Sequence, residues 1–431
     1  MRIRCLFFLL LLGTLPLLAS PAVVRDTIQD GWTDSADAYA TDEDQDSLAE
    51  DTAAATLDAV DLDSCQRLIA SRVEEIINTP FTQRSQVAVY IYDLTDDKPI
   101  VRHNISYMLR PASNAKLITA ITALSLLGSD YTYRTTLSTD GTLTADTLQG
   151  NVYIKAGYDP RFGRDDMAAF VNALKAEGIR VITGDVVFDI SMKDTLSLGW
   201  GWCWDDDDAN LSPLKYDGSG TFQHALKNML SANGMVLCGD YRNGRIPAAA
   251  HQRVERSHSI DQILGRMMKK SDNMYAESMF YQIAAKSGVA YAGRKQAVKY
   301  INRLVRQIGL NPDNYKFADG SGLSLYNYAS AELLVGLLRY AHQHDDIYNT
   351  LKPSLPVAGV DGTLRNRMKN GTAYGSVYAK TGTLMGVSTL SGYTRAANGH
   401  ELCFSIMTQG IRTSKEGRAW QDRICQAMTK K

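Results

Sequence analysis

Apolar positions along this chain recur with two periods, and each period predicts one kind of element. Apolar residues fall at three- and four-residue intervals over 64–77, which predicts a helix. β-Branched and aromatic residues dominate 87–92, and a short run at 99–102 follows a polar turn, so both are predicted strands. The same reasoning predicts further helices over 117–127, 165–177, 259–270, 274–285, 293–308, 331–342 and 415–428, and further strands over 151–155, 181–188, 387–394 and 401–409.

The order of these elements predicts an α+β fold. We expect an antiparallel sheet with the terminal helix on one face and a helical cluster on the other. Asn398-Gly399 is typical of a hairpin turn between the last two strands. Residues 148–255, in which short strands flank a helix, are predicted to form a smaller inserted α/β domain. The segments 64–147 and 256–431 would then form one discontinuous domain.

The first 22 residues are predicted to be a secretory signal peptide. Arg2 and Arg4 precede an apolar run of 13 residues, and small residues suited to cleavage follow it at 20–22. A membrane anchor is the alternative, but the run is short for a bilayer and contains Gly, Thr and Pro. We expect a protein secreted across the inner membrane into the periplasm, with no stable transmembrane anchor.

The formal charge of −1 conceals two regions of opposite sign. Residues 23–63 hold 13 acidic residues and one basic residue without apolar periodicity, which predicts an acidic disordered leash. The rest of the chain, from residue 64, holds 43 of the 46 Lys and Arg but 34 of the 47 Asp and Glu. A positive body suits an anionic polymer. Its basic residues are not interleaved with aromatics in a stripe, so no nucleic-acid partner is expected.

The cysteines favour no metal site. None of them has C-x-x-C spacing, so we expect neither zinc nor any other metal or cofactor. Cys403 alternates within an apolar strand and is predicted to be buried and free. In an oxidising compartment, Cys203 could pair with Cys238, and Cys65 with Cys425.

Three short motifs follow one another in a fixed order. Each is weak evidence by itself: a second S-x-x-K stands at 212–215 and a second S-x-N at 231–233, although Lys-Thr-Gly occurs once. The ordered set is specific, and its first member stands directly before the predicted helix at 117–127. The motifs are Ser113-Asn114-Ala115-Lys116, Ser271-Asp272-Asn273 and Lys380-Thr381-Gly382.

The first two motifs supply a nucleophile and its activation. A hydroxyl needs a base to take its proton, and on a helix Ser113 and Lys116 would share one face, about 5–6 Å apart at Cβ. Burial and a second cation, Lys380, would disfavour the charged form of Lys116 and make it that base. Ser271 can relay a proton to the leaving amine, and Asn273 can hold a substrate amide. The alternative is that the serines only cap helices and that Lys116 is solvated. This alternative is less favoured when all three motifs are present.

The third motif is predicted to bind substrate. The ammonium of Lys380 and the hydroxyl of Thr381 can bind a carboxylate, and Gly382 allows a substrate backbone to approach closely. Backbone N–H groups of Ser113 and Thr383 would form the oxyanion hole. The alternative is a strand-start turn with a solvated lysine.

With these motifs and several longer segments, the chain resembles the D-alanyl-D-alanine carboxypeptidase/endopeptidases among the low-molecular-mass penicillin-binding proteins. The resemblance covers roughly 85–410. It implies a penicilloyl-serine transferase (β-lactamase-like) fold, with an inserted domain between the first two motifs. The segments that carry it are RPASNAK (110–116), GYDP (157–160), GWGW (199–202), DGSGLS (319–324), LPVAGVDGTL (355–364) and KTGTL (380–384).

The resemblance also implies an activity. It implies a serine DD-peptidase that removes the terminal D-Ala from peptidoglycan stem peptides, often cleaves the D-Ala–diaminopimelate cross-link, and is captured covalently by β-lactams. Ser113 would be the nucleophile, Lys116 the base, and Asp159 would reach from the insert toward the substrate's side chain. Leu325 stands where the family usually has an arginine, so the residue at the third stem position and the endopeptidase activity stay open. A β-lactamase and a non-catalytic peptidoglycan-binding protein are the alternative functions.

Overall fold

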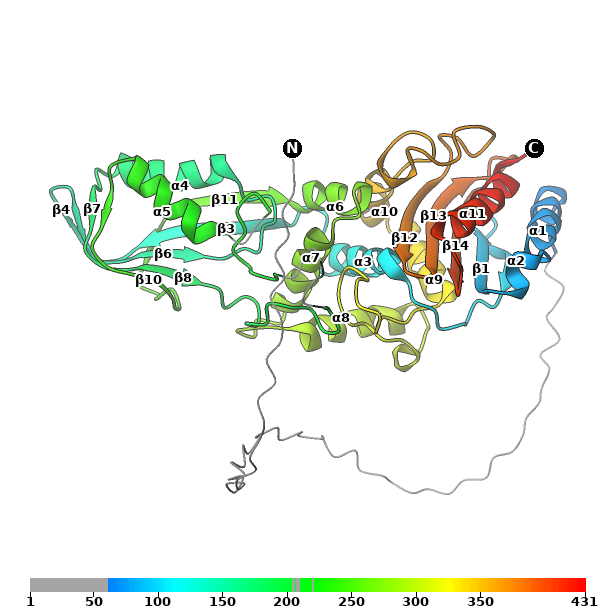
Figure 1. Ribbon diagram of the computed structural model, residues 1–431, viewed down its shortest axis with the longest axis horizontal. Helices are drawn as coiled ribbons and strands as arrows, with labels where there is room; N and C mark the ends of the chain where they lie inside the picture. Colours follow the sequence, from blue (N-terminus) through cyan, green and yellow to red (C-terminus); the bar gives the residue numbers. More distant parts are fainter. Residues whose placement is uncertain (1–60, 204–205, 207–209, 219–220) are drawn as a thin grey trace, which may run out of the picture. The chain divides into compact units, whose positions relative to one another are not determined.

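A five-stranded antiparallel sheet, in the order β12-β13-β14-β1-β2, contains the strands predicted at both ends of the chain (Figure 1). The computed structural model describes residues 61–203, 206, 210–218 and 221–431, so the predicted signal peptide and nearly all of the predicted leash lie outside the described residues. The predicted hairpin at Asn398-Gly399 is confirmed, because β13 pairs with β14 across it. The strands are β1 (Gln86–Asp93), β2 (Lys98–His103), β12 (Tyr378–Leu384), β13 (Val387–Arg395) and β14 (Glu401–Gln409).

Helices cover both faces of this first sheet, as the order of elements predicts. α11 (Ser414–Thr429) packs on β13, and α1 (Ser64–Ile77) packs against α11, whereas α9 (Ala331–His342) packs on β1 and β14 (Figure 1). Alternate residues of β1 point to the two sides. Val89 lies in the core with α1 and α11, and Tyr90 lies in the core with the other helices.

The helical cluster on the second face is built around α3 (Ala115–Leu127). Its residues 115–124 are all buried, and a helix that is buried on every side belongs in a core. The predicted helices of this cluster are confirmed to within a few residues, and α10 was not predicted. The others are α6 (Ile260–Lys269), α7 (Asn273–Ala285), α8 (Arg294–Gln307) and α10 (Asp345–Ser354).

A second sheet, in the order β10-β8-β6-β3-β11, is formed by the middle of the chain. β6, β8 and β10 are parallel to one another, whereas β3 is antiparallel to β6 and to β11. The strands are β3 (Thr132–Thr139), β6 (Val152–Lys155), β8 (Val186–Asp189), β10 (Tyr241–Asn243) and β11 (His251–Ser259). Two helices share its core, α4 (Arg164–Ala176) and α5 (Phe222–Ala232). A small four-stranded sheet joins β4 (Thr142–Thr144), β5 (Thr147–Gln149), β7 (Val181–Ile182) and β9 (Val236–Leu237).

The second sheet includes residues on both sides of the predicted insert at 148–255. It begins at Thr132 and ends at Ser259, because the strands that lead into and out of this region pair with each other. β3 was not predicted, because its threonines give no apolar alternation, although several of them are buried. The described residues belong to one compact unit, so the division into two domains stays a prediction.

The described cysteines are unpaired. Cys65, Cys203, Cys238, Cys403 and Cys425 are all free, so the two candidate disulfides are wrong, whereas the buried, free Cys403 is confirmed. An oxidising compartment permits a disulfide, but only proximity in the fold decides whether it forms.

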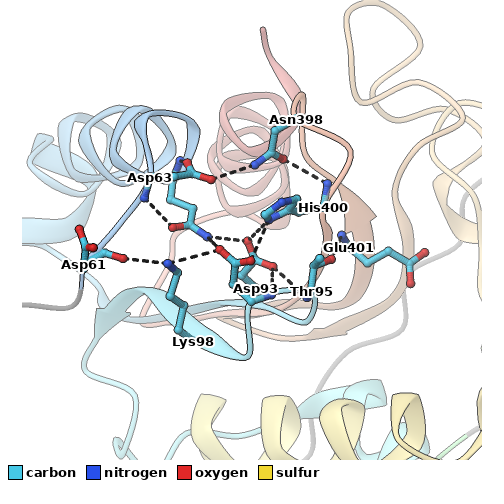
Figure 2. A network of polar contacts seen from close by, with 10 residues as sticks. Asp61, Asp63, Asp93, Thr95, Lys98, Asn398, His400 and Glu401 are labelled. Carbon is cyan, nitrogen blue, oxygen red and sulfur yellow. Dashed lines mark hydrogen bonds and ion pairs between the residues drawn. The ribbon is translucent and has the colours of Figure 1, made fainter.

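A polar network fixes the beginning of α1 to the turn after β1 (Figure 2). Asp63 caps α1 by accepting from the backbone N–H of Gln66 at 2.7 Å. The Gln66 amide in turn donates to Asp93 and Asp96, each at 2.8 Å. His400 Nδ1 lies 2.9 Å from Asp93, and that hydrogen bond raises the pKa of His400. The network therefore joins α1, β1 and the hairpin before β14.

Candidate active site

The first motif lies where a short 3-10 turn, Ala112–Asn114, leads into α3. Ser113 belongs to this turn, and Lys116 belongs to the first turn of α3. The Nζ of Lys116 lies 3.0 Å from the Oγ of Ser113, so the structure places the two groups side by side, as their spacing predicts. Lys116 is buried although it carries an ionisable amine.

Two further oxygens fix the Lys116 amine. It donates to Oδ1 of Asn273 at 2.8 Å and to the carbonyl of Ser321 at 2.8 Å. Asn273 comes from the beginning of α7, whose N-cap is Asp272, so the second motif both caps a helix and contacts the first motif. The carbonyl of Ser321 was not predicted as part of the site.

The second lysine, Lys380, lies on the edge strand β12 and is also buried. Its Nζ donates to Oγ of Ser271 at 2.8 Å and to the carbonyl of Thr381 at 2.6 Å. Burial, and next the positive charge of Lys116, hold the pKa of Lys380 well below its usual value. Repulsion between the ammonium groups acts on both lysines, so it favours a state in which one of them is neutral.

The backbone around the serines is strained. Ala112 and Ser271 have positive φ values of 47° and 60°, a conformation that costs non-glycine residues about 1–3 kcal/mol each. Gly322, at φ 82°, leaves room for this turn, because a Cβ there would lie 1.8 Å from the carbonyl oxygen of Ala112. Gly382 is constrained as well, since a Cβ there would lie 2.1 Å from the Thr389 hydroxyl and 2.8 Å from the carbonyl oxygen of Pro111. The edge strand therefore lies directly against the turn that carries the nucleophile candidate.

Asp319 organises the loop that presents the carbonyl of Ser321. Its carboxylate accepts from the backbone N–H groups of Gly322 at 2.7 Å and Ser324 at 2.6 Å. Trp202, from the middle of the chain, donates its indole N–H to the same carboxylate at 2.8 Å. Both residues stand in segments that carry the family resemblance, and that was the only sequence signal for this contact.

Glu277 is a second buried acid, and its contacts with the site were not predicted. It lies one turn along α7 from Asn273, and its Oε1 accepts from the backbone N–H groups of Ser321 at 2.8 Å and Gly320 at 3.1 Å. Burial, and next the negative charge of Asp319, raise the pKa of Glu277 to about 8. Glu277 therefore holds the Ser321 carbonyl where it meets Lys116.

Asp159 is not brought to this cluster by any hydrogen bond among the described residues. Its buried carboxylate lies 2.6 Å from Nδ1 of His258 and accepts from the backbone N–H of Arg161 at 2.9 Å. Burial is the main cause that raises the pKa of Asp159. The predicted contact of Asp159 with a substrate side chain stays a prediction.

The remaining predicted residues lie along β12. Thr381 Oγ1 donates to Oγ1 of Thr363 at 2.8 Å, which orients the Thr381 hydroxyl. Gly382 is buried against the serine turn, and Thr383 is exposed on the same edge strand. An exposed edge strand can pair with an extended peptide, which is consistent with the predicted binding roles of these residues.

A serine beside a buried lysine, with a second lysine and an asparagine close by, can perform acyl transfer without histidine. Fold and site thus define a serine hydrolase of the acyl-transfer class. The sequence matches the D-Ala-D-Ala carboxypeptidase 3 (S13) family over residues 69–215 and 214–431, so the chain belongs to this family. It is a serine-type D-Ala-D-Ala carboxypeptidase, as the motifs and the resemblance predicted.

Named relatives agree with this assignment. The chain is 23% identical over 414 residues to the D-alanyl-D-alanine carboxypeptidase DacB of Haemophilus influenzae, covering 76% of this chain and 86% of the relative. It is 26% identical over 438 residues to the D-alanyl-D-alanine carboxypeptidase of an Actinomadura species, covering 78% and 80%.

A solved structure supports the fold. The crystal structure of penicillin binding protein 4 from Haemophilus influenzae matches with a TM-score of 0.75 at 22% identity, covering 82% of this chain and 97% of that chain. The expected penicilloyl-serine transferase fold is confirmed. Among the described residues, no helix is long and apolar enough to cross a bilayer.

Proposed function

We propose that this enzyme removes the terminal D-Ala from peptidoglycan stem peptides through an acyl-enzyme on Ser113. Lys116 takes the Ser113 proton as the oxygen attacks the D-Ala–D-Ala carbonyl, and the N–H groups of Ser113 and Thr383 stabilise the oxyanion. Ser271 passes a proton to the leaving amine, and D-Ala departs. Water then attacks the ester carbonyl, and Ser113 regains its proton as the shortened peptide leaves.

The observation that carries this proposal is the position of the Lys116 amine. It lies within hydrogen-bond distance of both the Ser113 hydroxyl and the Asn273 side chain, 3.0 and 2.8 Å away. Asn273 and the carbonyl of Ser321 hold this amine beside the serine, since it donates to both at 2.8 Å. Burial and the charge of Lys116 lower the pKa of Lys380, so the two buried amines do not both carry a charge easily. The proposal requires the neutral amine at Lys116 when Ser113 attacks, with Lys380 carrying the charge that binds a substrate carboxylate.

The same acylation would open a D-Ala–diaminopimelate cross-link. A β-lactam would acylate Ser113 because its strained amide mimics the D-Ala–D-Ala bond.

We also propose that the chain is exported to the periplasm with removal of residues 1–22. N-terminal sequencing of the periplasmic fraction tests export, and a mature protein that keeps its first residues would contradict it.

A labelled penicillin tests the nucleophile. Wild type should be tagged and should release D-Ala, whereas Ser113→Ala should do neither. Ser212→Ala is the matched control, because Ser212 begins the other S-x-x-K sequence and should leave both activities intact. Equal tagging of wild type and Ser113→Ala would overturn the assignment. Rapid, sustained turnover of a chromogenic β-lactam would instead favour a β-lactamase.

A further inference from the structure

A cavity of about 450 Å³ lies at one edge of the second sheet, away from the three motifs. Among the residues that line it are the last residue of β6, Lys155, and the last residue of β8, Asp189. Arg245, which follows β10 by two residues, lines it as well. Three adjacent parallel strands thus contribute their carboxyl ends, which is where open sheets that contain parallel strands bind ligands.

The walls of this cavity are positively charged. Arg134, on β3, joins Lys155 and Arg245, and the one carboxylate among the lining residues is Asp189. That carboxylate is occupied, because it accepts from the backbone N–H of Ile246 at 3.0 Å and from the hydroxyl of Ser191 at 2.5 Å. Three cations against one satisfied carboxylate leave a net positive site.

Lys155 is the cation most available to a ligand. Its side chain is exposed, and its ammonium has no hydrogen bond or ion pair with any residue in the described part of the chain. The two arginines have acidic neighbours: Arg134 lies 3.4 Å from Glu255, and Arg245 lies 3.7 Å from Asp189. Lys155 is therefore the cation that can pair with an anion without giving up an acidic neighbour.

α7 connects the cavity to the candidate active site. Asn273 begins this helix and bonds Lys116, whereas Gln282, nine positions further along the helix, lines the cavity. At 1.5 Å per residue the two ends are about 14 Å apart. An extended chain covers that distance with roughly four residues, so the spacing suits a polymer that contacts both places.

We propose that this cavity binds a carboxylate-bearing segment of the polymeric substrate, remote from the peptide bond that is cleaved. The inference rests on the proposed function, since a stem peptide carries free carboxylates besides its terminal one. The cavity would then raise affinity for polymer without taking part in bond cleavage. A short peptide that ends in D-Ala-D-Ala would fill the catalytic cluster and leave the cavity empty.

Charge reversal at Lys155 tests the proposal. Lys155→Glu should release D-Ala from a short acylated tripeptide within twofold of the wild-type rate. On soluble uncross-linked peptidoglycan strands its kcat/KM should fall about tenfold, and the loss should shrink in 0.5 M salt because screening weakens exposed charge contacts. Lys155→Arg should restore most of the activity on polymer. Arg245→Gln is a second variant. It should likewise lower the activity on polymer and leave the activity on the tripeptide unchanged.

Lys227→Glu is the matched control. Lys227 is exposed on α5, in the same part of the fold but outside the cavity lining, so the same change of charge should leave both substrates unaffected. Strands amidated at the other stem carboxylates, with the terminal D-Ala carboxylate left free, should no longer distinguish Lys155→Glu from wild type. If the distinction persists, the cavity binds another anion of the polymer and the carboxylate assignment is wrong.

The proposed function and this inference fail in different ways. A wild-type protein that neither cleaves the tripeptide nor takes up penicillin would contradict the proposed function. If wild type cleaves the tripeptide, and Lys155→Glu and Lys227→Glu digest polymer at the same rate, the cavity has no part in substrate binding.

Discussion

Glu277 should make the stability of this protein depend on pH. Its carboxyl is fully buried and accepts two backbone N–H bonds, which favour the charged form, yet burial and Asp319 outweigh them and raise its pKa from 4.5 to about 8. Between these values the folded protein keeps a proton that the unfolded chain releases. Stability therefore falls as pH rises through this range.

The magnitude follows from proton linkage. One proton retained only in the folded state changes the free energy of unfolding by about 1.4 kcal/mol per pH unit, so the step from pH 5.5 to 7.5 should cost of order 2 kcal/mol. Glu277→Gln cannot titrate, and its Oε1 can still accept from Ser321 and Gly320. Urea unfolding at both pH values should show that the free energy of unfolding of wild type falls by about 2 kcal/mol more than that of this variant.

Comparison with the variant cancels every other titrating group that the two proteins share. Glu75→Gln, at an exposed position of α1, is the control and should follow the wild-type pH dependence. If wild type and Glu277→Gln change in parallel between pH 5.5 and 7.5, Glu277 is ionised throughout and the account of its burial is wrong.

Two further predictions concern the turn at Ser113 and the network around His400. Gly322→Ala would place a Cβ 1.8 Å from the carbonyl oxygen of Ala112, so the turn that carries Ser113 must move. A misplacement of about 1 Å can cost about 100-fold, so the rate of penicillin acylation should fall by about 10- to 100-fold. An unchanged rate in stopped-flow acylation would contradict the packing. His400, whose pKa is raised by Asp93, contributes stability that is complete below pH about 6.5 and is lost as pH rises through its folded pKa. His400→Gln should therefore destabilise the protein at pH 6 more than at pH 8 in thermal unfolding, and equal losses at both pH values would show that the charge does not matter.

The sequence predicted correctly those features of the structure that depend on residues close together in the chain. The apolar run after Ser113 predicted α3, and three-residue spacing predicted that Lys116 would lie beside the serine, because helix geometry alone sets that distance. Asn398-Gly399 predicted the last hairpin for the same reason, since a two-residue turn is a local choice. Strand β3 escaped prediction because its threonines lack apolar alternation, and its burial comes from partners distant in sequence.

The sequence by itself determined the chemistry: a serine, two lysines and an asparagine in an order typical of acyl transfer. Only the tertiary structure decided that Lys116 meets Asn273 and Ser321 across 157 and 205 residues, and that Trp202 holds the loop at Asp319. It also decided that Asp159 bonds His258 and that the ends of β6 and β8, with the loop after β10, line a basic cavity. Such contacts depend on how whole elements pack, and packing is set by the combined shape of the core, which no short stretch of sequence contains.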